Sequence, residues 1–329
     1  MVKSVSTTHA DERKPWANAP SFSALDQQGH LSFTAPSQKS ADRPQWRWSV
    51  VIPVRNESKT LPRVLSQLHA VPLDDIFVVV NGSSDTSRQV AEQYDCRILE
   101  YQSPLGHDVG RAVGARAARQ ADAILFLDAD IVVMAHELLP FLVSVENGLD
   151  VALNDINRLA LLNPKHPVNV AKASLNCTLK RPDLGYSSLT GIPHALSRKA
   201  LDAVGDESLI VPPLAQAKAI LHGLKVGLAG PVDVVGRNRI HGADSPVTSH
   251  ELEELILGDH VEAMAYVIHR LGARGGFSDG KRLRQHITND VNQPGPVESS
   301  TINRTRRPAF PQGTVIKPSK SFGTHPHPK

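Results

Sequence analysis

Short apolar runs alternate with stretches of helical periodicity between residues 48 and 128. WSVVIPV (48–54) and IFVVV (76–80) are continuous apolar runs, which is typical of strands that are buried on both faces. Between them, leucine or valine recurs at helical spacing, at positions 61, 64, 65 and 68. Strands that alternate with helices predict a parallel sheet.

The ends of these elements carry capping and turn signals. Thr60 is a candidate N-cap with Pro62 in the first helical turn, and Asp85 is a candidate cap for a helix that continues through Val90 and Tyr94. The next predicted elements are a strand at CRILE (96–100), a helix at DVGRAVGARAARQ (108–120) and a strand at AILFL (123–127). The pattern therefore predicts a series of βα units.

Polar clusters follow the strands of this series. They are Asn56 with Glu57, Asn81 to Asp85, His107 to Arg111, and Asp128 with Asp130. In open α/β sheets, ligands bind beyond the carboxyl ends of the strands. These four clusters are therefore the candidate site.

The pair Asp128 and Asp130 has a specific chemistry. Carboxylates at i and i+2 of an extended segment point the same way, so both can serve one ligand. A hard divalent cation held by oxygen atoms stabilises the negative charge on a departing diphosphate. The structural alternative is that the two residues only cap and turn the chain before the predicted helix at 136–145.

Four motifs in register resemble glycosyltransferase family 2 and its GT-A relatives. They are VVIPVRNESKTLPRVLSQL, IFVVVNGSSDTS, GHDVGRAVGARAA and LFLDADIVV, which lie within residues 49–135. The resemblance implies an α/β, Rossmann-like fold with a mixed, mostly parallel sheet flanked by helices and with flexible terminal tails. It implies a metal-dependent glycosyltransferase that uses Mn²⁺ or Mg²⁺, a UDP- or GDP-linked sugar donor and an unknown hydroxyl acceptor.

The resemblance also assigns roles to single residues. It places Pro53, Asn56 and Glu57 near the base, Asn81 and Asp85 near the base or ribose, and Arg111 beside the nucleotide. It assigns Asp128 and Asp130 to ribose and metal. Where the family often has Asp-Asp-Gly-Ser, this chain has Val-Asn-Gly-Ser at 80–83, which leaves the identity of the nucleotide open.

The second half matches the family less closely. LTGIPHALSRKALDAVG (189–205) resembles the strand and helix under the acceptor pocket, where Gly191 would let the backbone approach the donor. His194 lies beside apolar residues, which favours a structural role. Many inverting members have a Glu-Asp base in the next stretch, but VPPLAQAKAILHGLKV (211–226) contains no carboxylate. Asp206 and Glu207 are the nearest candidates for a general base.

Two mechanisms therefore stay open. Asp206 or Glu207 could serve an inverting reaction, whereas a retaining reaction assisted by the leaving phosphate needs no such base. VDVVGRNRIHGADSP (232–246) resembles retaining enzymes that are like glucosyl-3-phosphoglycerate synthase, which makes His241 a metal ligand. Arg237 and Arg239 would meet a diphosphate or an anionic acceptor, or else lie on a solvated edge strand.

Composition limits the remaining choices. The 329 residues carry a net charge of +3 and two distant cysteines, which suggest neither a nucleic-acid partner nor a disulfide framework and fit a cytoplasmic protein. No signal peptide and no spanning segment is apparent. We expect a flexible arm at 1–45 without helical or strand periodicity, a glycosyltransferase domain at 46–275 and a disordered basic tail at 276–329. The domain would divide into a nucleotide-sugar half (46–135) and an acceptor half (136–275), and the tail could weakly contact an anionic membrane surface.

A long helix is predicted at about 249–271. Its apolar residues are expected to form one core stripe, made of Leu252, Leu255, Ile256, Met264, Val267 and Ile268.

Two other functions compete with the transferase. A phosphatase of the haloacid-dehalogenase type also uses D-x-D, but there the pair follows the first strand of the domain, and here three βα units precede it. A non-catalytic sugar-nucleotide binder is favoured by the missing Glu-Asp base.

Overall fold

The computed structural model describes residues 22–25, 31–33, 46–234, 236 and 249–284. The chain divides into two units, Met1–Ser278 and Asp279–Lys329. The sheet and helices described below belong to the first unit. The predicted basic tail lies mostly outside the described residues.

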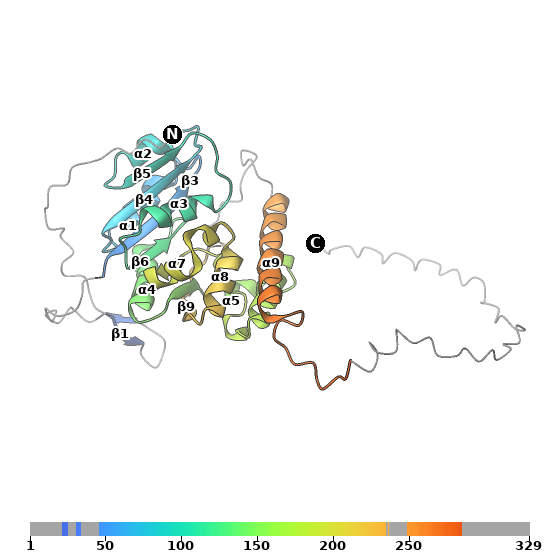
Figure 1. Ribbon diagram of the computed structural model, residues 1–329. Helices are drawn as coiled ribbons and strands as arrows, with labels where there is room; N and C mark the ends of the chain where they lie inside the picture. The colour runs from blue at the N-terminus through green and yellow to red at the C-terminus, as the bar shows by residue number, and fades with distance from the viewer. Residues whose placement is uncertain (1–21, 26–30, 34–45, 235, 237–248, 285–329) are drawn as a thin grey trace, which may run out of the picture. The chain divides into compact units, whose positions relative to one another are not determined.

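Seven strands form one sheet in the order β5-β4-β3-β6-β8-β7-β9 (Figure 1). They are β3 (Trp48–Val54), β4 (Asp75–Asn81), β5 (Arg97–Tyr101), β6 (Ala123–Phe126), β7 (Val151–Asn154), β8 (His194–Ser197) and β9 (Val226–Gly230). Only β8 runs antiparallel to its neighbours. The mixed, mostly parallel sheet flanked by helices confirms the predicted fold class.

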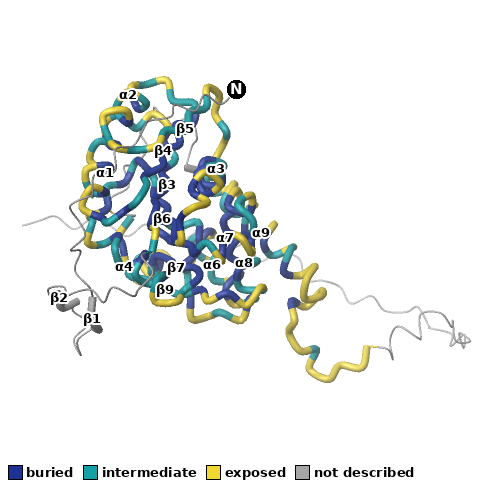
Figure 2. Tube along the Cα trace, turned by 60° about the vertical axis from the view of Figure 1, so that its left-hand side comes forward, coloured by how far each residue is buried: buried dark blue, intermediate teal, exposed yellow. Residues whose placement is uncertain are grey.

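Helices cover both faces of the sheet. They are α1 (Leu61–Leu68), α2 (Ser87–Ala91), α3 (Val109–Ala117), α4 (Ala135–Glu146), α5 (Asn157–Ala160), α6 (Pro167–Thr178), α7 (Arg198–Val204), α8 (Pro212–Leu221) and α9 (Ser249–Leu271), with short 3₁₀ turns η1 (Pro182–Leu184) and η2 (Asp206–Ile210). The core formed with α1 and α4 uses alternate residues of β3 such as Val50 and Ile52, whereas Val51 faces α3, α7 and α8. Figure 2 shows the resulting buried sheet between partly exposed helices.

Small residues let α3 lie close to β3. A Cβ atom at Gly114 would lie 2.2 Å from a methyl carbon of Val51, and one at Gly110 would lie 3.0 Å from Cβ of Pro53. Glycine is therefore required at position 114, since a packed β-branched side chain cannot move that far. Pro53 itself is half-buried at the end of β3.

The two predicted helix caps, Thr60 and Asp85, differ from the structure in detail. Thr60 precedes α1, but its side chain caps no backbone N–H, and its buried Oγ1 has no partner among the described residues. Asp85 accepts a hydrogen bond from the backbone N of Ser87 at 2.9 Å, although Thr86 is the residue that precedes α2. The helix ends at Ala91, so the prediction that it continues to Tyr94 was too long.

The arm contains a pair of strands, and one prediction for α9 needs correction. In the arm, Phe22–Leu25 (β1) and Leu31–Phe33 (β2) pair as antiparallel strands. Strands of three or four residues are too short to give a periodic signal in the sequence. In α9, Leu255 and Ile268 are 42% and 43% exposed, so they do not belong to the predicted core stripe. The buried face of α9 contains Val267, as predicted, together with His260 and Ala263.

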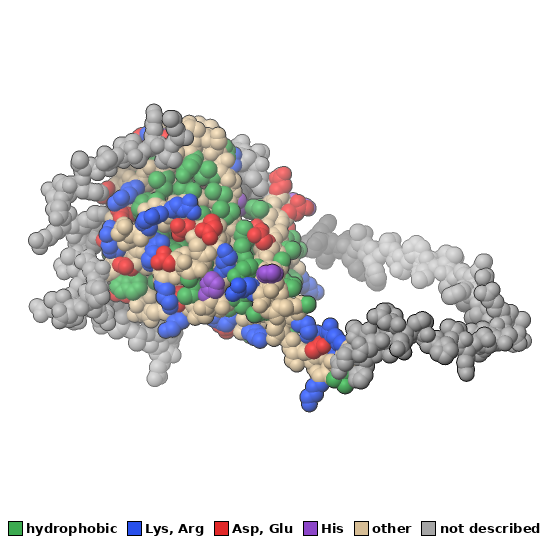
Figure 3. Space-filling view, in the orientation of Figure 1, with side chains coloured by type: hydrophobic (Ala, Val, Ile, Leu, Met, Phe, Trp, Pro, Cys, Tyr) green, Lys and Arg blue, Asp and Glu red, His purple; other side chains and the backbone are tan. Residues whose placement is uncertain are grey.

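The face drawn in Figure 3 does not show one dominant charge. Figure 3 shows acidic and basic side chains interspersed on the face in view. Within the described segments, no helix combines the length and the apolar character that a membrane span requires.

Candidate functional site

Loops that follow β3 and β4 are tied to each other by hydrogen bonds. Asn56, in the left-handed region at φ 55°, accepts a bond from the backbone N of Ser84 at 2.8 Å through Oδ1. The backbone N of Ser58 donates to Oδ2 of Asp85 at 3.0 Å. The structure therefore brings Asn56 and Asp85 together at the carboxyl edge of the sheet, and Glu57 lies between these two contacts in the sequence.

Asp85 is held as a carboxylate. Burial raises its pKa, but the hydrogen bonds from Ser87 and Ser58 outweigh burial and keep the pKa below its usual value. An ionised Asp85 accepts donors from both loops, so its charge fixes the shape of this edge.

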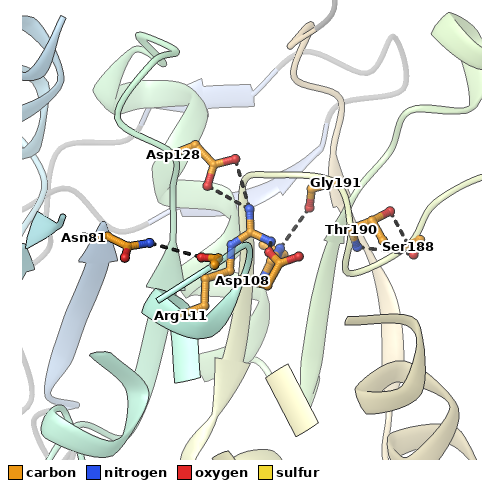
Figure 4. A network of polar contacts seen from close by, with 9 residues as sticks. Asn81, Asp108, Arg111, Asp128, Ser188, Thr190 and Gly191 are labelled. Atoms are coloured by element: carbon orange, nitrogen blue, oxygen red, sulfur yellow. Dashed lines mark hydrogen bonds and ion pairs between the residues drawn. The ribbon is translucent and has the colours of Figure 1, made fainter. Parts of the chain in front are cut away.

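Asn81 ends β4 and holds the loop after β5. Its Oδ1 accepts a bond from the backbone N of Leu105 at 2.6 Å. Its Nδ2 donates to the carbonyl of Gly106 at 3.1 Å, the bond drawn from Asn81 in Figure 4. Gly82 follows at φ 62°, and a Cβ there would lie 2.5 Å from N of Pro104. The Asn-Gly pair thus closes the turn against the loop at 104–106.

Arg111 is the central charge of the site. Its side chain is buried, and Nη2 donates to both oxygens of Asp128, at 2.7 and 3.0 Å, while Nη1 pairs with Asp108 (Figure 4). Burial lowers the pKa of Arg111, but the carboxylates of Asp108 and Asp128 raise it above its usual value. The guanidinium is therefore permanently charged and fixes the orientation of Asp128.

Asp128 and Asp130 follow β6 and are both partly exposed, with buried Ala129 between them. Their oxygen atoms are the donors that hard divalent cations prefer, so the donor chemistry fits Mn²⁺ or Mg²⁺. Within the described ranges, no group of three or more His, Cys, Asp or Glu side chains forms a complete metal site. The third predicted ligand, His241, lies outside the described residues, as do Arg237 and Arg239.

The turn at Ser188–Gly191, just before β8, forms another part of the candidate site. His194 donates from Nδ1 to the carbonyl of Gly191 at 2.9 Å and stacks on Phe126, with 5.2 Å between ring centroids. Burial, and then the charge of Arg111, lower the pKa of His194 to about 3. The sequence favoured a structural role for this histidine, and its bond to Gly191 and its stacking on Phe126 agree with that role.

Two buried amides hold this turn from behind. Gln216 accepts the backbone N of Leu189 at 2.9 Å and donates to Oδ1 of Asn176 at 2.7 Å. Asn176 donates to the carbonyls of Gly185 and Ser187, at 2.8 and 3.0 Å. Sequence reasoning missed both residues, because no periodic signal connects side chains forty positions apart.

A third amide links the turn to β9. Asn154, at the end of β7, donates to the carbonyls of Ile192 and Val232, at 2.8 and 3.0 Å, and accepts the backbone N of Val232 at 2.8 Å. Val232 begins the stretch that was expected to carry the metal-binding histidine. Asn154 therefore fixes the starting point of that stretch.

The predicted general bases lie along a different part of α3. Oδ2 of Asp206 is 3.8 Å from Nε of Arg116. Arg116 is five residues beyond Arg111, or about 7 Å along the helix axis. The carboxylate of Glu207 folds over Gly205, where an added Cβ would lie 2.1 Å from Oε1. Asp128 contacts the beginning of α3 and Asp206 its end, so the structure does not bring them together.

Helix α9 borders the site through Asp259. Burial, and then the carboxylates of Asp108 and Glu262, raise the pKa of Asp259 to about 6. Nothing in the spacing of α9 distinguishes this aspartate from the other acidic residues of the helix, so the sequence could not have identified it.

Comparisons with known proteins give a family match and several similar structures. Comparison with curated protein sequences gives no match. A glucosyl-3-phosphoglycerate synthase from Mycobacterium tuberculosis, in complex with Mn²⁺, UDP and phosphoglyceric acid, is 21% identical, with 73% of this chain and 87% of that chain covered and a TM-score of 0.47. A mycobacterial protein is 18% identical, with 75% and 82% covered and a TM-score of 0.49.

The family match covers the four motifs. The model of glycosyl transferase family 2 matches residues 49–158, from the second residue of β3 to the beginning of α5. This match agrees with the resemblance that the motifs carry, over residues 49–158.

Proposed function

We propose that the protein transfers a sugar from a nucleoside-diphosphate sugar to a hydroxyl acceptor in a reaction that requires a divalent metal. One observation carries the proposal. Within the family 2 segment, the Asp128-Ala129-Asp130 sequence stands at the carboxyl edge of β6, and a buried arginine, Arg111, fixes the first of its carboxylates. The experiment is a comparison of Mn²⁺-dependent UDP binding with and without the second carboxylate.

The donor binds along the edge formed by the loops after β3, β4 and β6. Pro53, Asn56 and Glu57 lie near the base, and Asn81 and Asp85 lie near the base or ribose. Hydrogen bonds within the chain hold these loops to each other, so little ordering entropy should be lost when a donor binds.

Asp128 and Asp130, with His241, would hold Mn²⁺ or Mg²⁺. The cation supplies neutralisation of the charge that develops on the departing diphosphate. Each oxygen of Asp128 accepts one bond from Arg111 and keeps further lone pairs for the ribose or a metal-bound water. Arg111 holds Asp128 in one orientation, and Asp130 would be the principal metal ligand.

Transfer breaks the bond between the anomeric carbon and the diphosphate oxygen and forms a bond from the acceptor oxygen to that carbon. The acceptor lies against the Ser188–Gly191 turn, where the Gly191 backbone permits close approach. Its hydroxyl proton passes to Asp206 or Glu207 in an inverting reaction, or to the leaving phosphate oxygen in a retaining one. The position of Asp206 beside Arg116 supports the retaining alternative.

The position of Asp206 beside Arg116 also supports a second candidate function. A protein without a base near the donor could bind a sugar nucleotide without turning it over. Release of UDP from UDP-sugars in the presence of acceptor mixtures distinguishes a transferase from a binder. A cytoplasmic location, and weak contact of the basic tail with a membrane surface, stay predictions.

Asp130→Ala tests the metal-dependent reaction. Loss of a metal ligand should weaken Mn²⁺-dependent UDP binding at least about 100-fold, as measured by calorimetry, because several kcal/mol of charge stabilisation are removed. Asp202→Ala is the matched control, since its side chain is 68% exposed on α7. Unchanged Mn²⁺-dependent affinity in Asp130→Ala, with an intact circular-dichroism spectrum, contradicts the proposal.

His241→Ala separates the mechanisms. If the reaction is retaining and His241 completes the metal site, metal affinity and turnover fall together, while Asp206→Ala and Glu207→Ala keep turnover. Full metal affinity in His241→Ala, together with loss of catalysis alone in a carboxylate variant, favours the inverting mechanism.

A further inference from the structure

A half-buried lysine lies on the inward face of α6. The buried residues of this face are Val168, Leu175, Asn176 and Leu179, and Lys172 occupies the remaining position of the same helical stripe. Burial lowers the pKa of the Lys172 ammonium group to about 8, because no carboxylate of the described residues lies close enough to offset it. A buried charge is costly to the fold unless it meets an opposite charge.

His260, on the buried face of α9, is a close neighbour of Lys172. Its Nδ1 donates to the carbonyl of Ile256 at 2.7 Å, so Nε2 of the neutral ring has only a lone pair to offer. This Nε2 is buried and has no partner among the described residues. Burial lowers the pKa of His260 despite the bond to Ile256, and the positive charge of Lys172 lowers it further. The two side chains therefore cannot neutralise each other.

The carboxylates of α9 do not supply the missing charge. The pKa of Asp259 is raised by burial and then by the carboxylates of Asp108 and Glu262, and Lys172 does not oppose this shift. Lys172 therefore lacks a negative charge, and Nε2 of His260 lacks a hydrogen-bond donor.

Lys172 lies close to the turn against which we place the acceptor. It precedes Asn176 by four residues, about 6 Å along one face of α6. Asn176 donates to the carbonyl of Ser187 at 3.0 Å, directly before the turn at Ser188–Gly191 that Figure 4 shows. The flexible stem of a lysine spans one helical turn, so a molecule on the turn can meet the ammonium group.

His260 lies at the level of α9 that borders the donor side. Asp259, one residue before it, responds to the charge of Asp108, and Asp108 is paired with Arg111. The space between α6 and α9 therefore opens near both sides of the candidate site.

We propose that Lys172 and His260 bind a small hydroxylated anion, and that this anion is the acceptor of the proposed transfer. Lys172 donates to a negatively charged oxygen of a carboxylate or a phosphate. One hydroxyl of the same molecule donates to Nε2 of His260, and another hydroxyl takes the sugar. Because Nε2 is covered, a neighbouring side chain has to shift, and the stem of Lys172 permits this. The role as acceptor rests on the proposed function, whereas binding of the anion does not.

Calorimetry of the full chain, without nucleotide or metal, tests the binding. The probes are gluconate, which is a carboxylate, and glycerol 3-phosphate, which is a phosphate, and at least one of them should bind. Glycerol, which has no charge, should not bind. Lys172→Met should weaken binding of the anion at least about tenfold, the usual effect of losing a hydrogen bond to a charged group. Lys165→Met, at an exposed position before α6, is the matched control and should leave the affinity unchanged.

His260→Leu tests the contact with the hydroxyl. The unaltered protein should prefer the hydroxylated probe to its counterpart without hydroxyls, which is acetate for gluconate and methyl phosphate for glycerol 3-phosphate. His260→Leu should lose this preference and keep the affinity for the counterpart. A preference that survives in His260→Leu overturns the role of His260.

The pH dependence tests the charge of Lys172. Affinity should fall as pH rises above about 8, because Lys172 then loses its proton in the free protein. Over this range His260 stays neutral and Asp259 stays ionised, so neither contributes. Lys172→Arg keeps its charge and should hold its affinity to higher pH. Equal pH profiles of the two proteins contradict binding through the ammonium group.

Two results overturn the site as a whole. One is that neither hydroxylated anion binds, and the other is that Lys172→Met binds the anion as tightly as Lys165→Met does. The role as acceptor is tested separately, by the rate at which UDP is released from UDP-sugars with acceptor mixtures. An anion that saturates the site and leaves this rate unchanged is not the acceptor. Asp130→Ala should keep the anion affinity, so failure of this site and failure of the metal-dependent donor site can be told apart.

Discussion

The two sides of the candidate site are built from different chemistry. The side that follows β3, β4 and β6 is formed by charges, with Arg111 held between Asp108 and Asp128 and with an ionised Asp85. The side formed by residues 185–192 is held by neutral groups, chiefly Asn176 and the other buried amides. Charge is concentrated where we propose that a metal and a diphosphate bind, and uncharged hydrogen bonds are used where only the shape of a turn must be kept. Buried amides with all their bonds made cost far less than buried ions.

Breaking the charged side should have the largest effect. Arg111→Met leaves Asp108 and Asp128 beside each other without their cation, and removing one partner of a buried ion cluster costs about 3 to 5 kcal/mol. Because the Asp128 side chain is 35% exposed, we expect about 3 kcal/mol, measured as the loss of unfolding free energy in urea.

Arg116→Met on the same helix is the control for Arg111→Met. Its side chain is 62% exposed and its partner is 3.8 Å away, so its loss should change stability by less than about 1 kcal/mol. Equal effects of the two substitutions would mean that the charged side is not organised around Arg111.

The first half of the sheet could be predicted from sequence because its signals are local. The run at 48–54 corresponds exactly to β3, and the helix expected at about 249–271 is α9. The short strands β7 and β9 were not predicted, since four or five residues carry too little pattern. In α9 the helical period was predicted correctly. However, buried Val267 and exposed Leu255 and Ile268 were assigned to the same stripe, because periodicity does not say which face meets the core.

The site could be predicted only where side chains follow strand ends. Asn56, Asp85, Arg111 and Asp128 could be predicted to lie at one edge because parallel strands bring their carboxyl ends together there. Asn176 and Gln216 could not be found, because their partners are backbone groups of a turn that is remote from both helices. Asp206 was predicted as a base only because it is close in sequence to the stretch where the base was expected. In the structure, η2 places its carboxylate beside Arg116.

Breaking the neutral side should cost less stability and leave donor binding unchanged. Gln216→Leu removes the acceptor of the Leu189 N–H and the donor to Asn176, and a buried group without its partner costs about 1 to 3 kcal/mol. We expect a loss of about 2 kcal/mol in unfolding free energy and a higher KM for the acceptor.

Gln93→Leu, at an exposed position, is the matched control for Gln216→Leu. The UDP affinity of Gln216→Leu should equal that of the unaltered protein. A drop in UDP affinity as large as the rise in acceptor KM would mean that the two sides are not separate.

Asn81 tests the donor side without removing a charge. Asn81→Ala releases the backbone groups of Leu105 and Gly106, which should loosen the loop after β5. We expect nucleoside-diphosphate affinity to fall by about 1 to 2 kcal/mol in calorimetry, within the usual range for a lost buried hydrogen bond. Unaltered UDP affinity, with the fold intact, would count against a role for Asn81 in the nucleotide pocket.

The smallest effect is expected from His194, a buried, uncharged group that bonds to Gly191. Its pKa is about 3 in the fold, against about 6.5 in an unfolded chain, so between these values the unfolded state binds the extra proton. Stability from this residue is therefore complete above pH 6.5 and falls as pH is lowered, by at most about 1.4 kcal/mol per pH unit. Between pH 7 and 5.5 we expect about 1 kcal/mol more loss of unfolding free energy in the unaltered protein than in His194→Gln, which carries no titrating group. Parallel pH profiles of the two proteins would mean that His194 is protonated without cost in the fold and that its bond to Gly191 does not depend on a neutral ring.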